Sequence, residues 1–346
     1  MFSIAVERNG QIRMVEIPDP LPSPYQAVIK SEAACICNAT DREIVDGNLP
    51  EVQRYPALLG HENVGVVVSV GNRVVSYQSG DRVVGGLLLT PTDPAYASGF
   101  GGFSQYVLAD DYVAMKRDGV LDEKPGDDVV CSVMRVVPPD IPVEAAAMLC
   151  TWREVLGSFN DMRILDAKRL IVFGGGPVGQ SFVRFAKLLG AEFVGLIDSH
   201  QSRRRLAATL GADEVFGRDD PRLLRQYARE AGQEIDAVID AVGREEVLNA
   251  GLQIIRQSGA VCVYGLLGSR RATFDTRSAP RNWRLAMHQW PIRDSEAFAQ
   301  EPLCDWIRAG ALNWQNFIQG QFPIADTATA MEQVRSRKVL KVLLRF

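Results

Sequence analysis

A glycine-rich turn between a strand and a helix constrains the fold of this chain most strongly. The sequence GGGPVG follows an apolar run at 169–173 and opens an amphipathic run at 178–189. Gly174 allows a tight turn, Gly176 lets the backbone approach a pyrophosphate, and Gly179 permits close packing of the helix on the strand. The pattern indicates a parallel α/β unit whose helix N-terminus faces the phosphates of a dinucleotide.

An acidic residue follows this turn at the distance that a dinucleotide site requires. The next apolar run, 193–198, ends in Asp198, 19 residues beyond Gly179. Its carboxylate can accept hydrogen bonds from both hydroxyls of an adenosine ribose, which favours NAD over NADP. Arg203 and the two arginines after it could offset part of the repulsion between Asp198 and a 2′-phosphate. The alternative is a glycine-rich turn with a solvated aspartate. The predicted cofactor contacts are Gly174, Gly176, Pro177, Val178, Gly179, Asp198 and Arg203.

The alternation of strands and helices extends well beyond the turn. Apolar strands and amphipathic helices follow one another over residues 155–293, which predicts a doubly wound parallel sheet. The preceding residues carry short alternating runs typical of β-structure. These runs lie at 3–6, 26–33, 63–70 and 103–107. After the sheet we expect helices at 295–308 and 325–335 and a strand at 339–344.

Length and charge agree with this organisation and exclude some partners. A chain of 346 residues predicts two domains. The 38 basic and 42 acidic residues give a net charge of -4, which provides no basic field for nucleic acid. The charged N-terminal residues and the absence of an 18-residue apolar run exclude a leader or a membrane span, so we expect a cytoplasmic protein. Six cysteines without a Cys-x-x-Cys array exclude a four-cysteine zinc knuckle.

A histidine and a glutamate stand together in the β-rich part of the chain. His61 and Glu62 lie in the sequence GHENVG, and His61 is the only histidine before His200. Imidazole is a good zinc ligand, so a metal site in this part would have to use His61 or do without imidazole. The alternative is that His61 is a hydrogen-bonded structural residue.

Motifs along almost the whole chain resemble the zinc-containing medium-chain dehydrogenases, which include alcohol, sorbitol and threonine dehydrogenases. They are EIPDPLPSP, CNATD, GHE, GDRV, GGFSQYV, EAAAML, GGGPVG, LGAD and KVLKVLL. The resemblance implies an α/β protein of three segments. These are a GroES-like β-rich catalytic domain (1–154), a Rossmann doubly wound domain (155–293) and a C-terminal return that completes the catalytic domain (294–346).

The same resemblance implies one catalytic zinc, and no structural zinc because the stretch 85–102 has no cysteine. His61 falls at the second ligand position, Glu62 at the acidic neighbour that can approach the metal, and Cys150 at the third ligand position. Without the family, Cys150 would be taken for a small buried thiol. One extra residue disturbs the first position: counting forward from the preceding strand selects Cys37, whereas counting back from Asp41 selects Asn38. We prefer Cys37, because an amide oxygen is a poor zinc ligand.

Further roles are implied at the edges of this site. Thr40 falls where the family has a hydroxyl that relays the alcohol proton; its alternative is a turn-capping threonine. Asp41 is expected to orient the loop or a ligand, and Lys341 resembles a basic residue near the cofactor pyrophosphate. Arg153 and its neighbours Trp152 and Glu154 could line a polar substrate pocket or form an interdomain salt bridge.

The expected activity is hydride transfer between NAD and a secondary alcohol, which would be a polyol, sugar or cyclitol, assisted by zinc. One alternative is a zinc-free reductase of the same superfamily that acts on an enone or quinone. Another is a non-catalytic dinucleotide-binding protein. The partners expected are the small alcohol or carbonyl substrate and further copies of the chain in a homodimer or homotetramer, with neither nucleic acid nor membrane.

Overall fold

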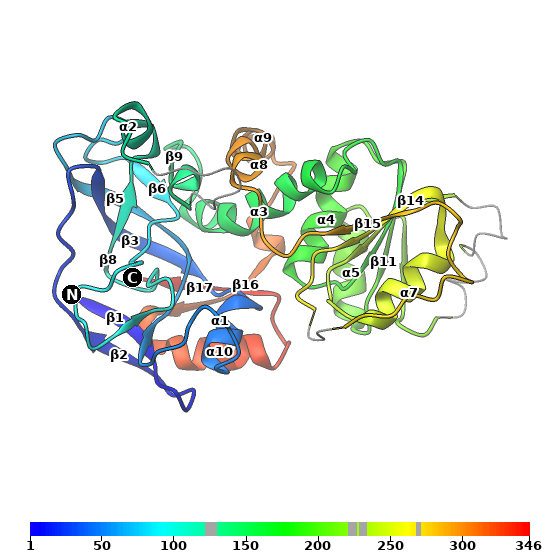
Figure 1. Ribbon diagram of the computed structural model, residues 1–346, viewed down its shortest axis with the longest axis horizontal. Coiled ribbons are helices and arrows are strands. Elements are labelled where there is room, and N and C mark those ends of the chain that lie inside the picture. The colour runs from blue at the N-terminus through cyan, green and yellow to red at the C-terminus, as the bar shows by residue number, and fades with distance from the viewer. Residues whose placement is uncertain (122–129, 221–226, 228–233, 268–270) are drawn as a thin grey trace. The chain divides into compact units, whose positions relative to one another are not determined.

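The short alternating strands and the longer strand–helix repeats fold into different parts of the structure, a computed structural model. It describes residues 1–121, 130–220, 227, 234–267 and 271–346 (Figure 1). The chain divides into two units, which are described separately. Unit 1 comprises Met1–Thr151 and Gln300–Phe346, and unit 2 comprises Trp152–Ala299. The predicted limits of 154/155 and 293/294 stay predictions.

Unit 2 contains a parallel sheet of six strands in the order β12-β11-β10-β13-β14-β15 among its described residues. The strands are β10 (Arg169–Phe173), β11 (Phe193–Ile197), β12 (Glu214–Phe216), β13 (Ile235–Asp240), β14 (Ile255–Val263) and β15 (Arg284–Met287). The helices are α4 (Pro177–Leu188), α5 (Gln201–Leu210), α7 (Glu245–Ile254) and α8 (Arg293–Phe298). The doubly wound sheet predicted from the strand–helix alternation is therefore confirmed.

The apolar faces of these elements form the core of unit 2. In Figure 1, α4, α5 and α7 lie beside the sheet, and they contact β10, β11, β13 and β14. Side chains from the strands, such as Ile171 and Val238, pack against Leu248 and Leu252 of α7. Because both faces of a parallel sheet are covered, its strands are continuous apolar runs rather than alternating ones.

Unit 1 is built from two sheets in its described residues. The smaller sheet has the order β2-β1-β4-β7, with β1 (Phe2–Val6), β2 (Ile12–Glu16), β4 (Ala57–Leu58) and β7 (Ala97–Ser98). The larger sheet has the order β16-β17-β3-β5-β6-β9, and β8 also pairs with β3. Its strands are β3 (Gln26–Cys35), β5 (Glu62–Val70), β6 (Arg82–Val84), β8 (Tyr106–Asp110), β9 (Arg135–Val137), β16 (Ile318–Pro323) and β17 (Lys341–Arg345). The GroES-like, β-rich class is confirmed.

Unit 1 also contains short helices and 3-10 turns. They are α1 (Thr40–Val45), α2 (Tyr112–Arg117), α9 (Gln300–Arg308), α10 (Thr327–Arg335) and the 3-10 turns η1 (Val130–Val133), η3 (Trp314–Asn316) and η4 (Ile324–Asp326). The helix α3 (Val143–Asp161) begins in unit 1 and ends in unit 2. Strand β17 returns from the C-terminal segment to lie between β16 and β3.

Two predicted elements are wrong in detail. The strand expected at 103–107 is β8, three residues later, because Phe103 is fully buried in a hydrophobic cluster at the preceding bend. The helix expected at 295–308 is broken into α8 and α9 at Ala299. Pro302 explains the break, since its ring would clash with the carbonyl group four residues earlier, at Phe298, in a continuous helix.

Candidate functional site

The backbone of the glycine turn agrees with the role expected of each of its three glycines. Gly174 has a φ of 96°, in the left-handed region that favours glycine. A Cβ atom on Gly179 would lie 1.7 Å from the carbonyl oxygen of Gly174, so only glycine fits where α4 meets the strand. A Cβ on Gly176 would meet nothing within 4 Å. The residue that precedes α4 therefore faces open space, as a bound pyrophosphate requires.

Asp198 lies directly after β11 and is tied to this turn. Its Oδ2 accepts a hydrogen bond from the backbone N–H of Gly175 at 2.7 Å, and its Oδ1 accepts one from the N–H of His200 at 2.6 Å. The Arg203 guanidinium lies 3.7 Å from Oδ2. A carboxylate has about four lone-pair positions, so these contacts leave capacity for ribose hydroxyls.

Gln180 also supports the turn, and sequence analysis did not identify it. Its side-chain amide donates to the carbonyl oxygens of Gly175 at 3.1 Å and Arg203 at 2.8 Å. The side chain thus joins the glycine turn to α5. Its position directly after Gly179 was the available signal, but glutamine has no fixed role there.

Three predicted metal-site residues come together in unit 1. One ligand atom each from Cys37, His61 and Glu62 lies within 4.8 Å of the other two. The strand register explains this, because Cys35 at the end of β3 is directly opposite Glu62 at the start of β5. Cys37, two residues after Cys35, and His61, just before Glu62, therefore lie at the same end of the sheet.

Asp41 orients two of these residues at once. Its Oδ1 lies 3.1 Å from Nδ1 of His61, and its Oδ2 accepts the backbone N–H of Cys37 at 2.8 Å. The Asp41 side chain is fully buried. Because Nδ1 of His61 contacts Asp41, the other ring nitrogen, Nε2, is available for a metal ion, an arrangement common for metal-binding histidines.

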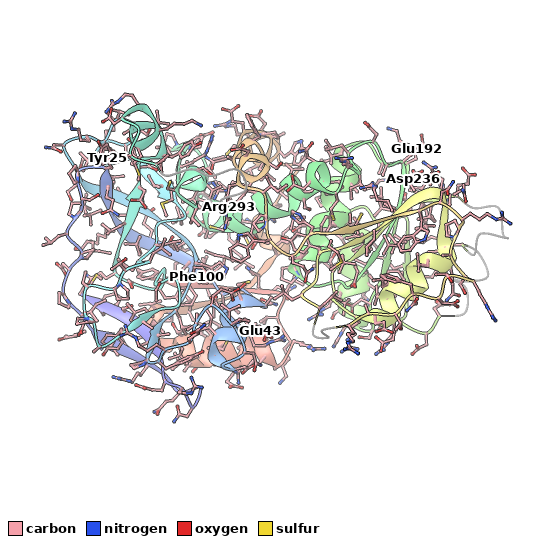
Figure 2. All side chains as sticks on the ribbon, in the orientation of Figure 1. Tyr25, Glu43, Phe100, Glu192, Asp236 and Arg293 are labelled. Atoms are coloured by element: carbon pink, nitrogen blue, oxygen red, sulfur yellow. The ribbon has the colours of Figure 1, made fainter. Side chains whose placement is uncertain are left out.

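The surroundings of His61 favour the protonated form of its ring. Burial lowers the pKa of His61, but the charge and hydrogen bond of Asp41, followed by Cys37, outweigh it and hold the pKa well above its ordinary value. The ring also packs against Phe100, labelled in Figure 2, with 5.4 Å between the ring centroids. In contrast, Cys35 is fully buried, and burial raises the pKa of its thiol.

Glu62 makes a buried cluster with Lys341 and Thr151. Its Oε1 accepts hydrogen bonds from Lys341 Nζ at 2.9 Å and from Thr151 Oγ1 at 3.0 Å. Lys341 Nζ also lies 2.6 Å from Glu62 Oε2 and donates to Thr151 Oγ1 at 3.1 Å. Burial lowers the pKa of Lys341, but Glu62 and then Cys37 outweigh it and raise the pKa. Sequence analysis expected Lys341 near a pyrophosphate and did not identify Thr151.

Other candidate residues lie outside the Cys37, His61 and Glu62 group. The Cys150 thiol is buried and lies 4.0 Å from the carbonyl oxygen of Asn63. The Asn38 amide donates to the carbonyl oxygen of Leu340 at 3.0 Å. Thr40 is the first residue of α1, and Ala39 rather than Thr40 is its N-cap. Arg153 is 1% exposed and pairs with Glu296 within unit 2, so this ion pair is not the interdomain salt bridge that was the expected alternative.

The residues of this group fit a zinc ion. Sulfur, imidazole and carboxylate donors are the ligand types that zinc prefers. Within the described residues, Glu62 Oε2 accepts no hydrogen bond of ordinary geometry although it is buried. It lies 2.6 Å from the Lys341 ammonium, so its remaining lone pair is what Glu62 Oε2 could offer a metal ion.

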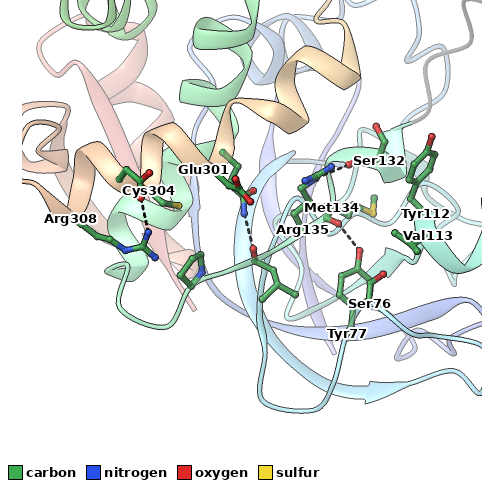
Figure 3. A pocket seen from close by; sticks show the side chains of 14 residues that line it. Ser76, Tyr77, Tyr112, Val113, Ser132, Met134, Arg135, Glu301, Cys304 and Arg308 are labelled. Carbon is green, nitrogen blue, oxygen red and sulfur yellow. Dashed lines mark hydrogen bonds and ion pairs between the residues drawn. The ribbon is translucent and has the colours of Figure 1, made fainter. Parts of the chain in front are cut away.

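A separate cavity of about 580 Å³ lies in unit 1 (Figure 3). Its lining includes Tyr112 of α2, Arg135 of β9 and Arg308 of α9. None of the predicted metal or cofactor residues lines it. We therefore place the candidate chemistry at the Cys37 group and the glycine turn, where the donor atoms are, rather than at this cavity.

Known proteins resemble the chain in both units. The family described as "Alcohol dehydrogenase GroES-like domain" matches residues 23–119, and the family described as "Zinc-binding dehydrogenase" matches residues 177–295. A sorbitol dehydrogenase from Bombyx mori is 25% identical over 360 residues, covering 99% of this chain and 98% of that protein.

Two further proteins extend the resemblance. An NADP-dependent isopropanol dehydrogenase from Thermoanaerobacter brockii is 28% identical over 274 residues, which cover 78% of this chain and 76% of that protein. The solved structure of 2R,3R-butanediol dehydrogenase from Bacillus subtilis matches the fold with a TM-score of 0.81 and 19% identity, covering 100% of this chain and 99% of that one.

Proposed function

Because the chain belongs to the zinc-containing medium-chain dehydrogenase family, we propose that it oxidises a secondary alcohol with NAD as the hydride acceptor. The enzyme is a zinc-dependent oxidoreductase for alcohols or polyols, the class that its relatives represent. The observation that carries the proposal is the group of Cys37, His61 and Glu62 donors beside the buried Asp41. These relatives do not favour the enone reductase or the non-catalytic protein.

We assign the metal ligands as Cys37, His61 and Cys150, with Glu62 beside them. When bound, zinc supplies a Lewis acid that lowers the pKa of the substrate hydroxyl. The chain's own residues prepare the site: Asp41 fixes the His61 ring and the Cys37 backbone. Support for Cys37 over Asn38 comes from their contacts, since Cys37 lies with His61 whereas the Asn38 amide is bonded to the backbone.

The glycine turn and Asp198 are assigned to the nicotinamide cofactor. Gly176 and the residues Pro177 and Val178 that open α4 would receive the pyrophosphate, and Asp198 would bind the adenosine ribose. Asp198 supports NAD as the cofactor, and Arg203 is the residue that would tolerate a 2′-phosphate. The Lys341 ammonium donates to Glu62 and Thr151. These contacts in unit 1 give no support to its assignment to the pyrophosphate.

The oxidation removes one hydride and one proton from the alcohol. Bound NAD would supply the acceptor for the carbinol hydrogen and its electron pair, and the hydroxyl proton would leave toward solvent. We assign the Thr40 hydroxyl at the start of α1 to relay that proton: it would receive the alcohol proton and pass its own hydrogen on toward solvent. Polyols, sugars or cyclitols are the proposed substrates, supported by the sorbitol dehydrogenase and D-xylulose reductase relatives.

We also propose that the enzyme is a homodimer or homotetramer.

Among the residues that the structure describes, no helix has the length and apolar character needed to span a membrane. The cytoplasmic location and the single zinc per chain stay predictions.

Metal content and turnover together test the proposed function. The purified chain should hold about one zinc per subunit and should reduce NAD in the presence of at least one polyol or sugar. His61→Ala should lose both zinc and turnover, because imidazole is a principal ligand. Full turnover in that variant would defeat the zinc mechanism, and a clear preference for NADP would defeat the cofactor assignment.

A further inference from the structure

The buried cluster around Glu62 contains a hydroxyl that no family motif assigns. Thr151 directly follows Cys150 in α3, and its side chain is 3% exposed. Its Oγ1 accepts from Lys341 Nζ at 3.1 Å and donates to Glu62 Oε1 at 3.0 Å. A hydroxyl has one hydrogen to donate, so these two contacts fix its direction.

This hydroxyl determines how the Glu62 carboxylate is held. Oε1 receives two hydrogen bonds, one from Thr151 and one from Lys341. Oε2 contacts Lys341 at 2.6 Å and accepts no ordinary hydrogen bond within the described residues. A carboxylate anchored through one oxygen keeps its plane fixed, and its other oxygen retains lone pairs. A carboxylate oxygen of Glu62 is also within 4.8 Å of the Cys37 and His61 donors.

We propose that Thr151 is a positioning residue for the metal site: its hydroxyl anchors Oε1 of Glu62 so that the carboxylate stays beside Cys37 and His61. Lys341 alone does not define this position, because a flexible ammonium group can follow the carboxylate as it turns. The hydroxyl, on a short and branched side chain within a helix, cannot follow it. The proposal rests on the zinc function proposed above.

Zinc affinity measured by competition with a chelator tests the role of Thr151. Thr151→Val replaces the hydroxyl with a methyl group of similar volume, and we expect zinc affinity to fall about tenfold or more, as when other supports of metal ligands are removed. Thr151→Ser keeps the hydroxyl and should stay near the wild-type value. A thermal melt of the metal-free proteins checks that both variants fold.

The Glu62→Gln background separates positioning from a general structural effect. If Thr151 acts through the carboxylate, Thr151→Val should cause a much smaller change in zinc affinity in Glu62→Gln than in the wild type. The absorption bands of the Co²⁺-loaded protein should likewise shift in Thr151→Val and return toward wild type in Thr151→Ser.

Two results would overturn the assignment. One is a wild-type zinc affinity in a folded Thr151→Val variant. The other is an equal loss of affinity in both backgrounds, which would mean that Thr151 acts on the neighbouring Cys150 or on the helix instead. A wild-type chain that binds no zinc would overturn the proposed function as well, so the two failures are distinct.

Discussion

The Asp41 carboxylate contacts the His61 ring through one oxygen, at 3.1 Å from Nδ1, and the backbone of Cys37 through the other. One buried side chain therefore fixes a histidine that directly precedes β5 and a cysteine two residues beyond the end of β3. The two proposed ligands depend on the same group, so its loss should affect both.

Asp41→Asn should weaken zinc binding by about 10- to 100-fold, the usual effect of removing a support of a ligand. The amide keeps the size of the carboxylate but cannot accept hydrogen bonds through both of its arms. Zinc retention after dialysis against a chelator measures the effect. Asp46→Asn at the other end of α1 is the matched control, because Asp46 contacts only arginines among its ion pairs in the described residues. Equal retention in both variants would contradict the assigned role.

Gly176→Ala and Gly179→Ala should affect different properties, cofactor binding in the first and stability in the second. Gly176→Ala should leave the unfolding free energy nearly unchanged, since its Cβ meets nothing within 4 Å, but raise KM for NAD by about tenfold or more. Gly179→Ala should lower the unfolding free energy by about 3 kcal/mol, because its Cβ would lie 1.7 Å from a carbonyl oxygen.

Chemical denaturation and cofactor kinetics measure the two effects. Gly217→Ala is the control, because Gly217 also faces open space but lies outside the turn. If Gly176→Ala bound NAD as well as Gly217→Ala does, the open space at Gly176 would not be the pyrophosphate site.

Asp198→Asn should reduce the discrimination between NAD and NADP. The substitution removes the negative charge that would repel a 2′-phosphate, while Arg203 remains close by. We expect KM for NAD to rise and KM for NADP to fall, so that their ratio changes by about tenfold. Glu192→Gln, at an exposed site labelled in Figure 2, is the charge control. An unchanged ratio would show that Asp198 does not set the cofactor preference.

Asp111 should make the stability of unit 1 sensitive to acid. Burial raises the pKa of Asp111, but hydrogen bonds from the backbone N–H groups of Val75, Ala114 and Ser76 and from the Ser76 hydroxyl outweigh it and lower the pKa. Because the native pKa lies below the unfolded value, the ionised carboxylate stabilises the fold above about pH 4. This stabilisation is lost as the pH falls through the native pKa.

Asp111→Ala should therefore cost about 3 kcal/mol near neutral pH, since it removes the N-cap of α2 and leaves buried N–H groups unpaired. The difference from wild type should shrink in acid. Urea unfolding at several pH values measures it, with Asp19→Asn at an exposed site of unit 1 as the control. A difference that did not depend on pH would contradict the charge effect.

The parts that sequence predicted best are those set by local geometry. Gly174, Gly176 and Gly179 lie within six residues, and their roles follow from one turn between a strand and a helix. His61 and Glu62 are adjacent at the start of β5, so the sequence places both at one end of a strand. The break before α9 could also have been predicted, since Pro302 marks it.

The metal site itself could not be completed from the sequence. Whether Cys37 or Asn38 would lie near His61 depended on how the loop after β3 accommodates one extra residue. The contact of Lys341 with Glu62 required the order β17-β3-β5, which no local pattern encodes. Thr151 was missed for the same reason, because its partners lie 89 and 190 residues away.

The place of β17 has a consequence for synthesis on the ribosome. Unit 2 is one continuous segment, whereas the larger sheet of unit 1 lacks β16 and β17, of which β17 pairs with β3, until the chain beyond unit 2 has emerged. Domains usually fold in the order in which they are translated. Here unit 2, although it comes later in the sequence, can complete its folding first, and Glu62 lacks its partner Lys341 until β17 has been synthesised. Nascent unit 1 therefore needs protection from aggregation for longer than unit 2 does.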